Sequence, residues 1–309
     1  MNKKKCPHCC SPITVRNGTR GGVQLYKCMA CGRQFRGKVY LDKLTLWEHY
    51  LEGKQTLNEL AATHSVSIST VQRLLRGVSI PWRNPVCRGY GVVQIGATYF
   101  GRNCGVLVAL EASSGRPLYL KHIAHERTSD YADALAWIEH DGYVVDGIVI
   151  DGMQTLFTLF DGYKVQMCQY HMCAIVRRKL TGNPRLSAGI ELKALMATLT
   201  TSDRERFTEA FEAWVIKWDA FLKERTVSPE TGKTFYTHRR LRSAMASIRF
   251  YLPYLFTWQE VKGMPNTNNK LEGIFADLKR NINNHSGMSR KNRERFINGF
   301  FLALGNNPQ

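Results

Sequence analysis

The chain has 309 residues, of which 44% are hydrophobic and 22% are charged. This composition is typical of a globular protein and excludes wholesale disorder and fibrous structure. Lysine and arginine number 43 against 25 aspartate and glutamate, so the formal net charge is +18. Such a surplus favours a polyanionic partner, with nucleic acid ahead of membrane lipid.

No run of 18 or more apolar residues is present, and no apolar stretch follows the basic N-terminus. We therefore expect neither a membrane-spanning helix nor a signal peptide. The expected location is the cytoplasm, with nucleoid association in a bacterium. The nine cysteines would then lie in a reducing setting, where metal binding is favoured over disulfide formation.

Four cysteines near the N-terminus form two Cys-x-x-Cys pairs with the spacing of a zinc ribbon. They are Cys6, Cys9, Cys28 and Cys31. Two such turns aim four thiolates at one Zn²⁺ ion, although four unrelated thiols or a redox pair are the alternative. We predict a zinc ribbon over residues 1–40 whose folding depends on the ion, with His8 and Cys10 outside the ligand set.

Residues 41–85 have the pattern of a helix-turn-helix DNA-binding domain. A Thr-x-x-Glu capping box at Thr56 opens one helix, and Ser67 opens the next. The outward positions of the second helix are expected to meet phosphates and base edges. These positions are Ser69, Thr70, Gln72, Arg73 and Arg76. A plain helical hairpin is the alternative, but residues 1–80 hold 13 basic and 4 acidic residues, or +9, which favours DNA binding.

Three apolar strands are expected next, followed by an amphipathic helix and a fully apolar strand. Their ranges are 92–100, 105–111, 117–123, 129–140 and 147–150. This βββαβ order is that of an RNase H-like core, in which metal-binding acids lie on the first strand and after the fourth. Asp151, at the end of the last strand and beside a glycine, is therefore a catalytic candidate. A turn-capping aspartate is the alternative.

A short strand then leads into a basic helix at Cys168 and His171, and Arg177, Arg178 and Lys179 follow. By themselves, Cys168 and His171 are half a metal site, or a structural cysteine and a capping histidine. The periodicity then becomes helical, and a last pair of helices carries Glu272 and further basic residues expected to face DNA. These basic residues are Lys270, Lys279 and Arg280.

The predicted fold is thus multidomain α+β. A zinc ribbon and a helix-turn-helix precede an RNase H-like α/β core that is interrupted by an all-α insertion. The expected ranges are 86–183 for the first part of the core, 184–262 for the insertion and 263–309 for the C-terminal helices of the core.

Several motifs, together with the ribbon and the helix-turn-helix, resemble the DDE transposases of the Mutator-like superfamily and their bacterial insertion-sequence relatives. In chain order they are Ala97-Thr98-Tyr99-Phe100-Gly101-Arg102, Asp151-Gly152, Cys168-Gln169-Tyr170-His171, Leu252-Pro253-Tyr254-Leu255-Phe256-Thr257 and Pro265-Asn266-Thr267-Asn268-Asn269-Lys270-Leu271-Glu272-Gly273. They cover nearly the whole chain, and their shared order is more specific than any single motif.

The resemblance implies an enzyme of DNA transposition and recombination. Such an enzyme binds double-stranded terminal inverted repeats, cleaves DNA with Mg²⁺ and transfers the freed 3′-hydroxyl to target DNA. It implies that Asp151 and Glu272 hold two Mg²⁺ ions. It also implies that Cys168 and His171 support the active site in a structural or DNA-positioning role and not as ligands of the catalytic ions. It also implies a homodimer or higher oligomer that pairs two transposon ends.

One position departs from the family: Gly96 stands where the family has its first catalytic aspartate. That carboxylate bridges both metal ions, so its loss is expected to cost roughly 10³ or more in rate. The chain is therefore expected to be impaired or inactive, through an engineered or a natural substitution. The alternative is compensation by Glu111, since a hairpin centred near residues 102–103 would place it on the same face as Gly96.

Two other functions remain open. A domesticated or decayed transposase could act as a non-catalytic DNA-binding protein or repressor, which Gly96 supports and the retained Asp151 and Glu272 oppose. An RNA-processing or repair nuclease on the same core is disfavoured by the helix-turn-helix and the helical insertion.

Overall fold

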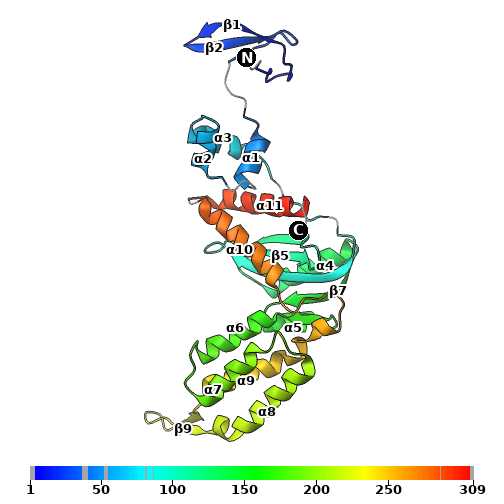
Figure 1. Cartoon of the computed structure of the whole chain (residues 1–309), viewed down its shortest axis with the longest axis vertical. Helices are drawn as coiled ribbons and strands as arrows, with labels where there is room; N and C mark the ends of the chain where they lie inside the picture. The colour runs from blue at the N-terminus through cyan, green and yellow to red at the C-terminus, as the bar shows by residue number, and fades with distance from the viewer. Residues whose placement is uncertain are drawn as a thin grey trace. The chain divides into compact units, whose positions relative to one another are not determined.

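The computed structural model describes residues 4–36, 41–51, 55–80, 82–85, 87–285 and 287–306. It divides into two compact units, Met1–Ser79 and Ile80–Gln309, here called unit 1 and unit 2 and described separately. The chain is a mixed α/β protein (Figure 1). The predicted domain limits at residues 40 and 86 lie outside the described residues.

Unit 1 begins with a three-stranded antiparallel sheet in the order β1-β2-β3. The strands are β1 (Thr14–Arg20), β2 (Val23–Cys28) and β3 (Gln34–Arg36). The first two strands form an antiparallel hairpin, and β3 adds only three residues. Among residues 4–36 only Cys6 and Cys28 are buried, so this sheet has almost no apolar core of its own.

Three short helices complete unit 1. They are α1 (Lys43–Leu51), α2 (Leu57–Thr63) and α3 (Ile68–Arg76). The predicted capping box is present, since the Thr56 N–H donates to Glu59 Oε2 at 2.7 Å and the Glu59 N–H donates to Thr56 Oγ1 at 3.2 Å. Ser67 caps α3 with a single bond of this kind, since the Thr70 N–H donates to Ser67 Oγ at 3.2 Å. Leu60 and Val71 are fully buried between the helices.

Unit 2 is built on a five-stranded mixed sheet in the order β6-β5-β4-β7-β8. The strands are β4 (Gly89–Tyr99), β5 (Gly105–Glu111), β6 (Pro117–Ile123), β7 (Tyr143–Ile150) and β8 (Val165–Met167). β4, β5 and β6 are antiparallel neighbours, whereas β7 is parallel to both β4 and β8. Parallel β7 and β8 therefore end at the same edge of the sheet.

The two faces of this sheet bury different partners. Val93 and Ile95 of β4 pack in one apolar core with Tyr131 and Ile138 of α4 (Thr128–His140). Because side chains alternate along a strand, Gln94 and Gly96 point to the other face, which α10 (Asn269–Asn284) and α11 (Arg290–Asn306) cover. This second face carries the residues discussed below.

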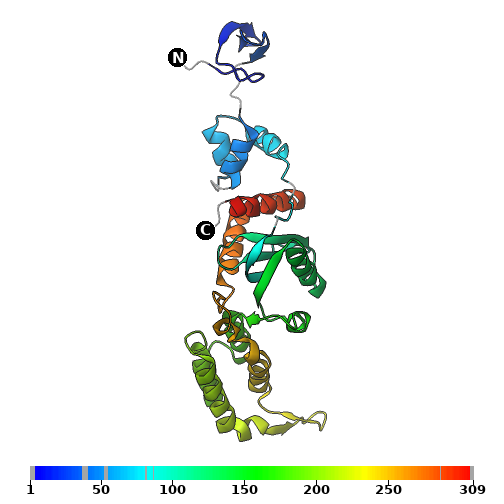
Figure 2. The same cartoon turned by 90° about the vertical axis from the view of Figure 1, so that its right-hand side faces the viewer.

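The remaining helices gather at the end of unit 2 away from α11, as Figures 1 and 2 both show. They are α5 (Gln154–Leu159), α6 (Gln169–Leu180), α7 (Ser187–Ala197), α8 (Arg204–Lys223), α9 (Arg239–Tyr251) and two 3₁₀ turns at Leu252–Tyr254 and Thr257–Gln259. A short hairpin of β9 (Arg225–Val227) and β10 (Thr234–Tyr236) joins α8 to α9. In the described part of the chain, no helix has both the length and the apolar character needed to cross a membrane.

Candidate functional site

Asp151 and Cys168 lie side by side because two parallel strands end together. Ile150 is the last residue of β7 and pairs with Met167, the last residue of β8. The Cys168 N–H donates to the Ile150 carbonyl at 2.9 Å, so each side chain follows its strand at the same level. The carboxyl ends of parallel strands are a frequent place for ligand-binding residues.

His171 completes a compact cluster with these two residues. It lies in the first turn of α6, and its Nδ1 is 2.9 Å from Asp151 Oδ1, although the ring N–H is not well aligned with that oxygen. The ligand atoms of Asp151, Cys168 and His171 all lie within 4.8 Å of one another. The Asp151 carboxylate, with a smaller contribution from Cys168, raises the pKa of His171 to about 10.

Asn268 ties α10 to this cluster. Its backbone N–H donates to Cys168 Sγ at 3.2 Å, and its side-chain Nδ2 donates to Asp151 Oδ1 at 3.4 Å. The side chain is fully buried, yet its Oδ1 has no hydrogen-bond partner among the described residues. The sequence alone assigns no role to Asn268, although this residue lies within the motif Pro265–Gly273 of the resemblance.

Glu272 lies one helical turn after Asn268 on α10 and is half-buried. Burial raises the pKa of its carboxyl above the usual value, and the negative charge of Asp151 raises it further, while His171 and Lys279 oppose the shift. The charges of Asp151 and His171 therefore act on the Glu272 carboxyl. Glu272 does not, however, contribute one of the ligand atoms that lie within 4.8 Å of one another.

Gly96 faces Asp151 from the neighbouring strand. A Cβ at position 96 would lie 3.7 Å from Asp151 Oδ2 and 3.7 Å from Asn268 Nδ2. It would also lie 3.2 Å from Leu271 Cδ2, which would have to move by a few tenths of an ångström. A side chain at position 96 would thus enter the cluster directly.

The strand register excludes the alternative in which Glu111 compensates for the missing aspartate. Gly96 pairs with Val108, and Glu111 pairs with Val93, so Glu111 points to the opposite face of the sheet from Gly96. Its carboxylate accepts hydrogen bonds from Ser114 and Tyr143 and lies 3.6 Å from the Arg116 Nε. Glu111 is therefore held away from Asp151 by other partners.

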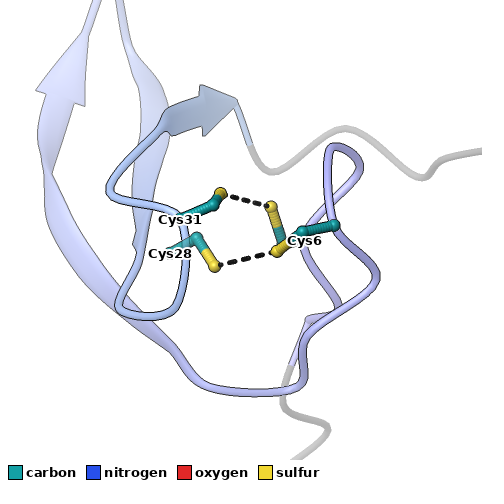
Figure 3. Close-up of side chains that lie close together, drawn as sticks. Cys6, Cys28 and Cys31 are labelled. Carbon is teal, nitrogen blue, oxygen red and sulfur yellow. Dashed lines mark hydrogen bonds between the residues drawn. The ribbon is translucent and has the colours of Figure 1, made fainter.

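In unit 1 the four N-terminal cysteines converge as the spacing predicted. Cys6 Sγ lies 3.7 Å from Cys31 Sγ, and Cys9 Sγ lies 3.5 Å from Cys28 Sγ, with all four sulfurs within 4.8 Å (Figure 3). Four thiolates around one Zn²⁺ at ~2.3 Å would be roughly 3.8 Å apart, so the cluster is compatible with a structural zinc ion. Backbone N–H groups of Cys31 and Ala30 lower the pKa of Cys28 to about 6.

The two cysteine turns share one backbone geometry. The Cys10 N–H donates to the Cys6 carbonyl, and the Gly32 N–H donates to the Cys28 carbonyl, each at 2.9 Å. Cys10 and Gly32 both have positive φ angles, 59° and 71°. Cys10 therefore occupies the place of a turn glycine, and it is not among the clustered ligands.

The predicted DNA-contacting residues of α3 differ in exposure. Ser69, Arg73 and Arg76 are exposed, whereas Thr70 and Gln72 are half-buried. The Thr70 hydroxyl lies 3.0 Å from Ser67 Oγ and is thus part of the helix cap. The exposed face of α3 is therefore narrower than predicted, since only three of the five side chains are exposed.

The predicted basic contacts of unit 2 also divide into two groups. Lys179 donates to the Ser243 carbonyl, Ser243 Oγ and Ser247 Oγ, and burial lowers its pKa. Lys270 donates to the Ser113 carbonyl at 2.6 Å. Both ammonium groups thus hold parts of unit 2 together. The other four side chains are exposed: Arg177, Arg178, Lys279 and Arg280.

No protein-family model matches the chain, and no curated protein matches it.

Proposed function

We propose that this chain is a transposase-type DNA-binding protein whose phosphodiester chemistry is disabled at Gly96. The observation that carries the proposal is the approach of position 96 to Asp151, since a Cβ there would lie 3.7 Å from Asp151 Oδ2. The resemblance requires carboxylates at these two places. The strand order β6-β5-β4-β7-β8, with α4 preceding the parallel β7, supports an RNase H-like core.

Unit 1 is proposed to bind the DNA ends. Residues 1–80 carry half of the net positive charge, and α3 would act as the recognition helix of a helix-turn-helix, with Arg73 and Arg76 toward DNA. The four-cysteine cluster would hold zinc and fix the ribbon. A dimer would bring two ends together, and the exposed Arg177, Arg178 and Arg280 would contact flanking DNA in the nucleoid.

The ligand set of the chain as it stands does not fit two Mg²⁺ ions. Mg²⁺ prefers carboxylate and water oxygens, whereas Asp151 is paired with His171 and lies beside Cys168. When bound, the two ions of an active relative would activate the attacking group and stabilise the leaving oxygen. Here Asp151 and Glu272 alone would remain to hold them.

Two observations favour a second function, namely the glycine at position 96 and the pairing of Asp151 with His171. A protein that lacks a carboxylate at position 96 and ties Asp151 to a histidine is suited to DNA binding without cleavage. Such a transposase-derived protein would act as a repressor at the transposon ends.

The proposal is tested by restoring the missing carboxylate. We would compare the unaltered chain with Gly96→Asp, using DNA that carries the terminal repeats flanking its own gene, with Mg²⁺ or Mn²⁺. Gly96→Asn is the matched control, because it adds the same volume without the charge. Cleavage and strand transfer by Gly96→Asp alone are expected.

Three other outcomes would contradict this proposal or favour the repressor function. Cleavage by the unaltered chain would show that another group replaces the missing aspartate and would overturn the assignment of Gly96. Binding of the repeats without cleavage by any variant would favour the repressor function. Absence of specific binding by all three proteins would overturn both proposals.

A further inference from the structure

Asp151, Cys168 and His171 present three different metal-ligand atoms to one point in unit 2. The atoms lie within 4.8 Å of one another, and Nδ1 and Oδ1 are 2.9 Å apart. Ligands of a tetrahedral zinc ion are roughly 3.3–3.8 Å apart, given metal–ligand distances of ~2.0–2.3 Å. Small side-chain shifts would therefore bring the three atoms into coordination range.

We propose that this cluster binds a zinc-type transition-metal ion, separate from the ion of the four-cysteine cluster. A thiolate and an imidazole select zinc and similar metals over Mg²⁺, which prefers oxygen ligands. On binding, the cation would replace the Nδ1 proton of His171 and the thiol proton of Cys168, and both protons would pass to solvent.

The surroundings of the cluster supply a second, independent reason. Asn268 is fully buried against Cys168 and Asp151, and its Oδ1 is unpartnered within the described residues. Buried polar atoms are rarely left without a partner. A water held as the fourth ligand of the ion would donate to this oxygen, and three protein ligands plus one water form a common open zinc site.

The cluster is also held in place before any metal binds. Parallel pairing of β7 and β8 fixes Asp151 and Cys168 at one level, and α6 places His171 one turn after Cys168. Neighbouring contacts brace this arrangement, since Gln169 exchanges hydrogen bonds of 3.0 Å with Asn266. A site on such rigid elements binds metal without a large ordering cost.

The test counts zinc in the purified full chain after dialysis against zinc-free buffer that contains millimolar Mg²⁺. We expect about two zinc ions per chain, one from each cluster. Cys168→Ser and His171→Ala should each lose about one ion. Cys173→Ser is the matched control, because this thiol is also on α6 but donates to the Met196 carbonyl outside the cluster, and it should retain both ions.

A second measurement starts from a variant in which unit 2 is unchanged. Cys28→Ser removes a ligand only from the cluster of unit 1, so about one zinc ion should remain, and Co²⁺ in its place should show the absorption of tetrahedral coordination with a single thiolate. Loss of all zinc from Cys28→Ser would overturn the proposal. So would zinc that persists when Cys168→Ser is added to Cys28→Ser. Because no DNA is used, these outcomes are independent of the proposed function.

Discussion

The two metal-ligand clusters of this chain are built in opposite ways. In unit 1, two short turns bring four cysteines together on a sheet whose only buried side chains among residues 4–36 are Cys6 and Cys28. In unit 2, Asp151, Cys168 and His171 project from strands and a helix that are already fixed by a large apolar core. In unit 1 the metal would replace a core, whereas in unit 2 the core creates the site.

The largest expected effect is the loss of structure in unit 1 when metal is removed. A strong chelator should abolish hydrogen-exchange protection in residues 4–36, because structural zinc supplies an apparent ~10–16 kcal/mol to folds of this kind. Cys28→Ser should have the same effect. Residues 87–285 should stay protected, since their core does not depend on an ion.

Hydrogen exchange followed by mass spectrometry measures both regions in one sample. Unchanged protection of residues 4–36 after chelation would show that unit 1 also folds without metal, so that the two clusters would not differ in this respect. Collapse of residues 87–285 would show that the core, too, depends on metal.

Destabilising unit 2 requires a change in the packing of its apolar core. At Gly147 of β7, an added Cβ would collide with Met264 Cε and lie 3.0 Å from the Lys164 carbonyl oxygen. That carbonyl accepts a hydrogen bond from the Ile148 N–H, so it cannot move freely. Gly147→Ala should therefore destabilise unit 2 by about 1–3 kcal/mol.

Denaturant unfolding followed by tryptophan fluorescence checks this effect, because all tryptophans except Trp47 lie in unit 2. Gly273→Ala is the control, since its Cβ would meet no described atom within 4 Å, and alanine in a helix should stabilise by about 0.5–1 kcal/mol. Zinc in the four-cysteine cluster should be unaffected by either change. Equal stabilities of the two variants would mean that β7 tolerates extra volume.

The contrast between the clusters also explains what the sequence could predict. The four cysteines lie in two local turns, so their spacing alone predicts that they meet. The sequence marks Asp151, and separately the pair Cys168 and His171, as candidate site residues. The contact between Asp151 and His171, however, depends on the parallel pairing of β7 with β8. No local pattern encodes which strands become neighbours.

The register between β4 and β5 differs by one residue from the register that the sequence predicts, and this difference misplaces Glu111. The expected hairpin centre would pair Gly96 with residue 109, whereas the pairing is with Val108. Phe100 and Cys104 close the turn, and Asn103 adopts a positive φ of 55°. Because side chains alternate along a strand, this shift of one residue moves Glu111 to the opposite face.

A smaller effect is expected where a second carboxylate enters the cluster of unit 2. Without divalent cations, Gly96→Asp should be less stable than Gly96→Asn by about 1–2 kcal/mol, because its carboxylate would repel that of Asp151 nearby. Excess Mg²⁺ should reverse this order. Thermal unfolding with and without Mg²⁺ measures the difference, and identical curves would mean that a side chain at position 96 does not reach Asp151.

The smallest expected effect returns to unit 1 and concerns Cys10. This residue has the left-handed backbone geometry that Gly32 has in the other turn, which costs a non-glycine residue about 1–2 kcal/mol. Replacing Cys10 with glycine removes this backbone cost. Glycine also gives the unfolded chain more conformational entropy, which offsets about 0.5–1 kcal/mol of the stabilisation. Cys10→Gly should thus stabilise the metal-bound ribbon by about 0.5–1 kcal/mol and strengthen its zinc binding slightly, as measured by competition with a chelator. Weaker zinc binding by Cys10→Gly would instead mean that Cys10 takes the place of one of the four clustered thiolates, because structural zinc is four-coordinate.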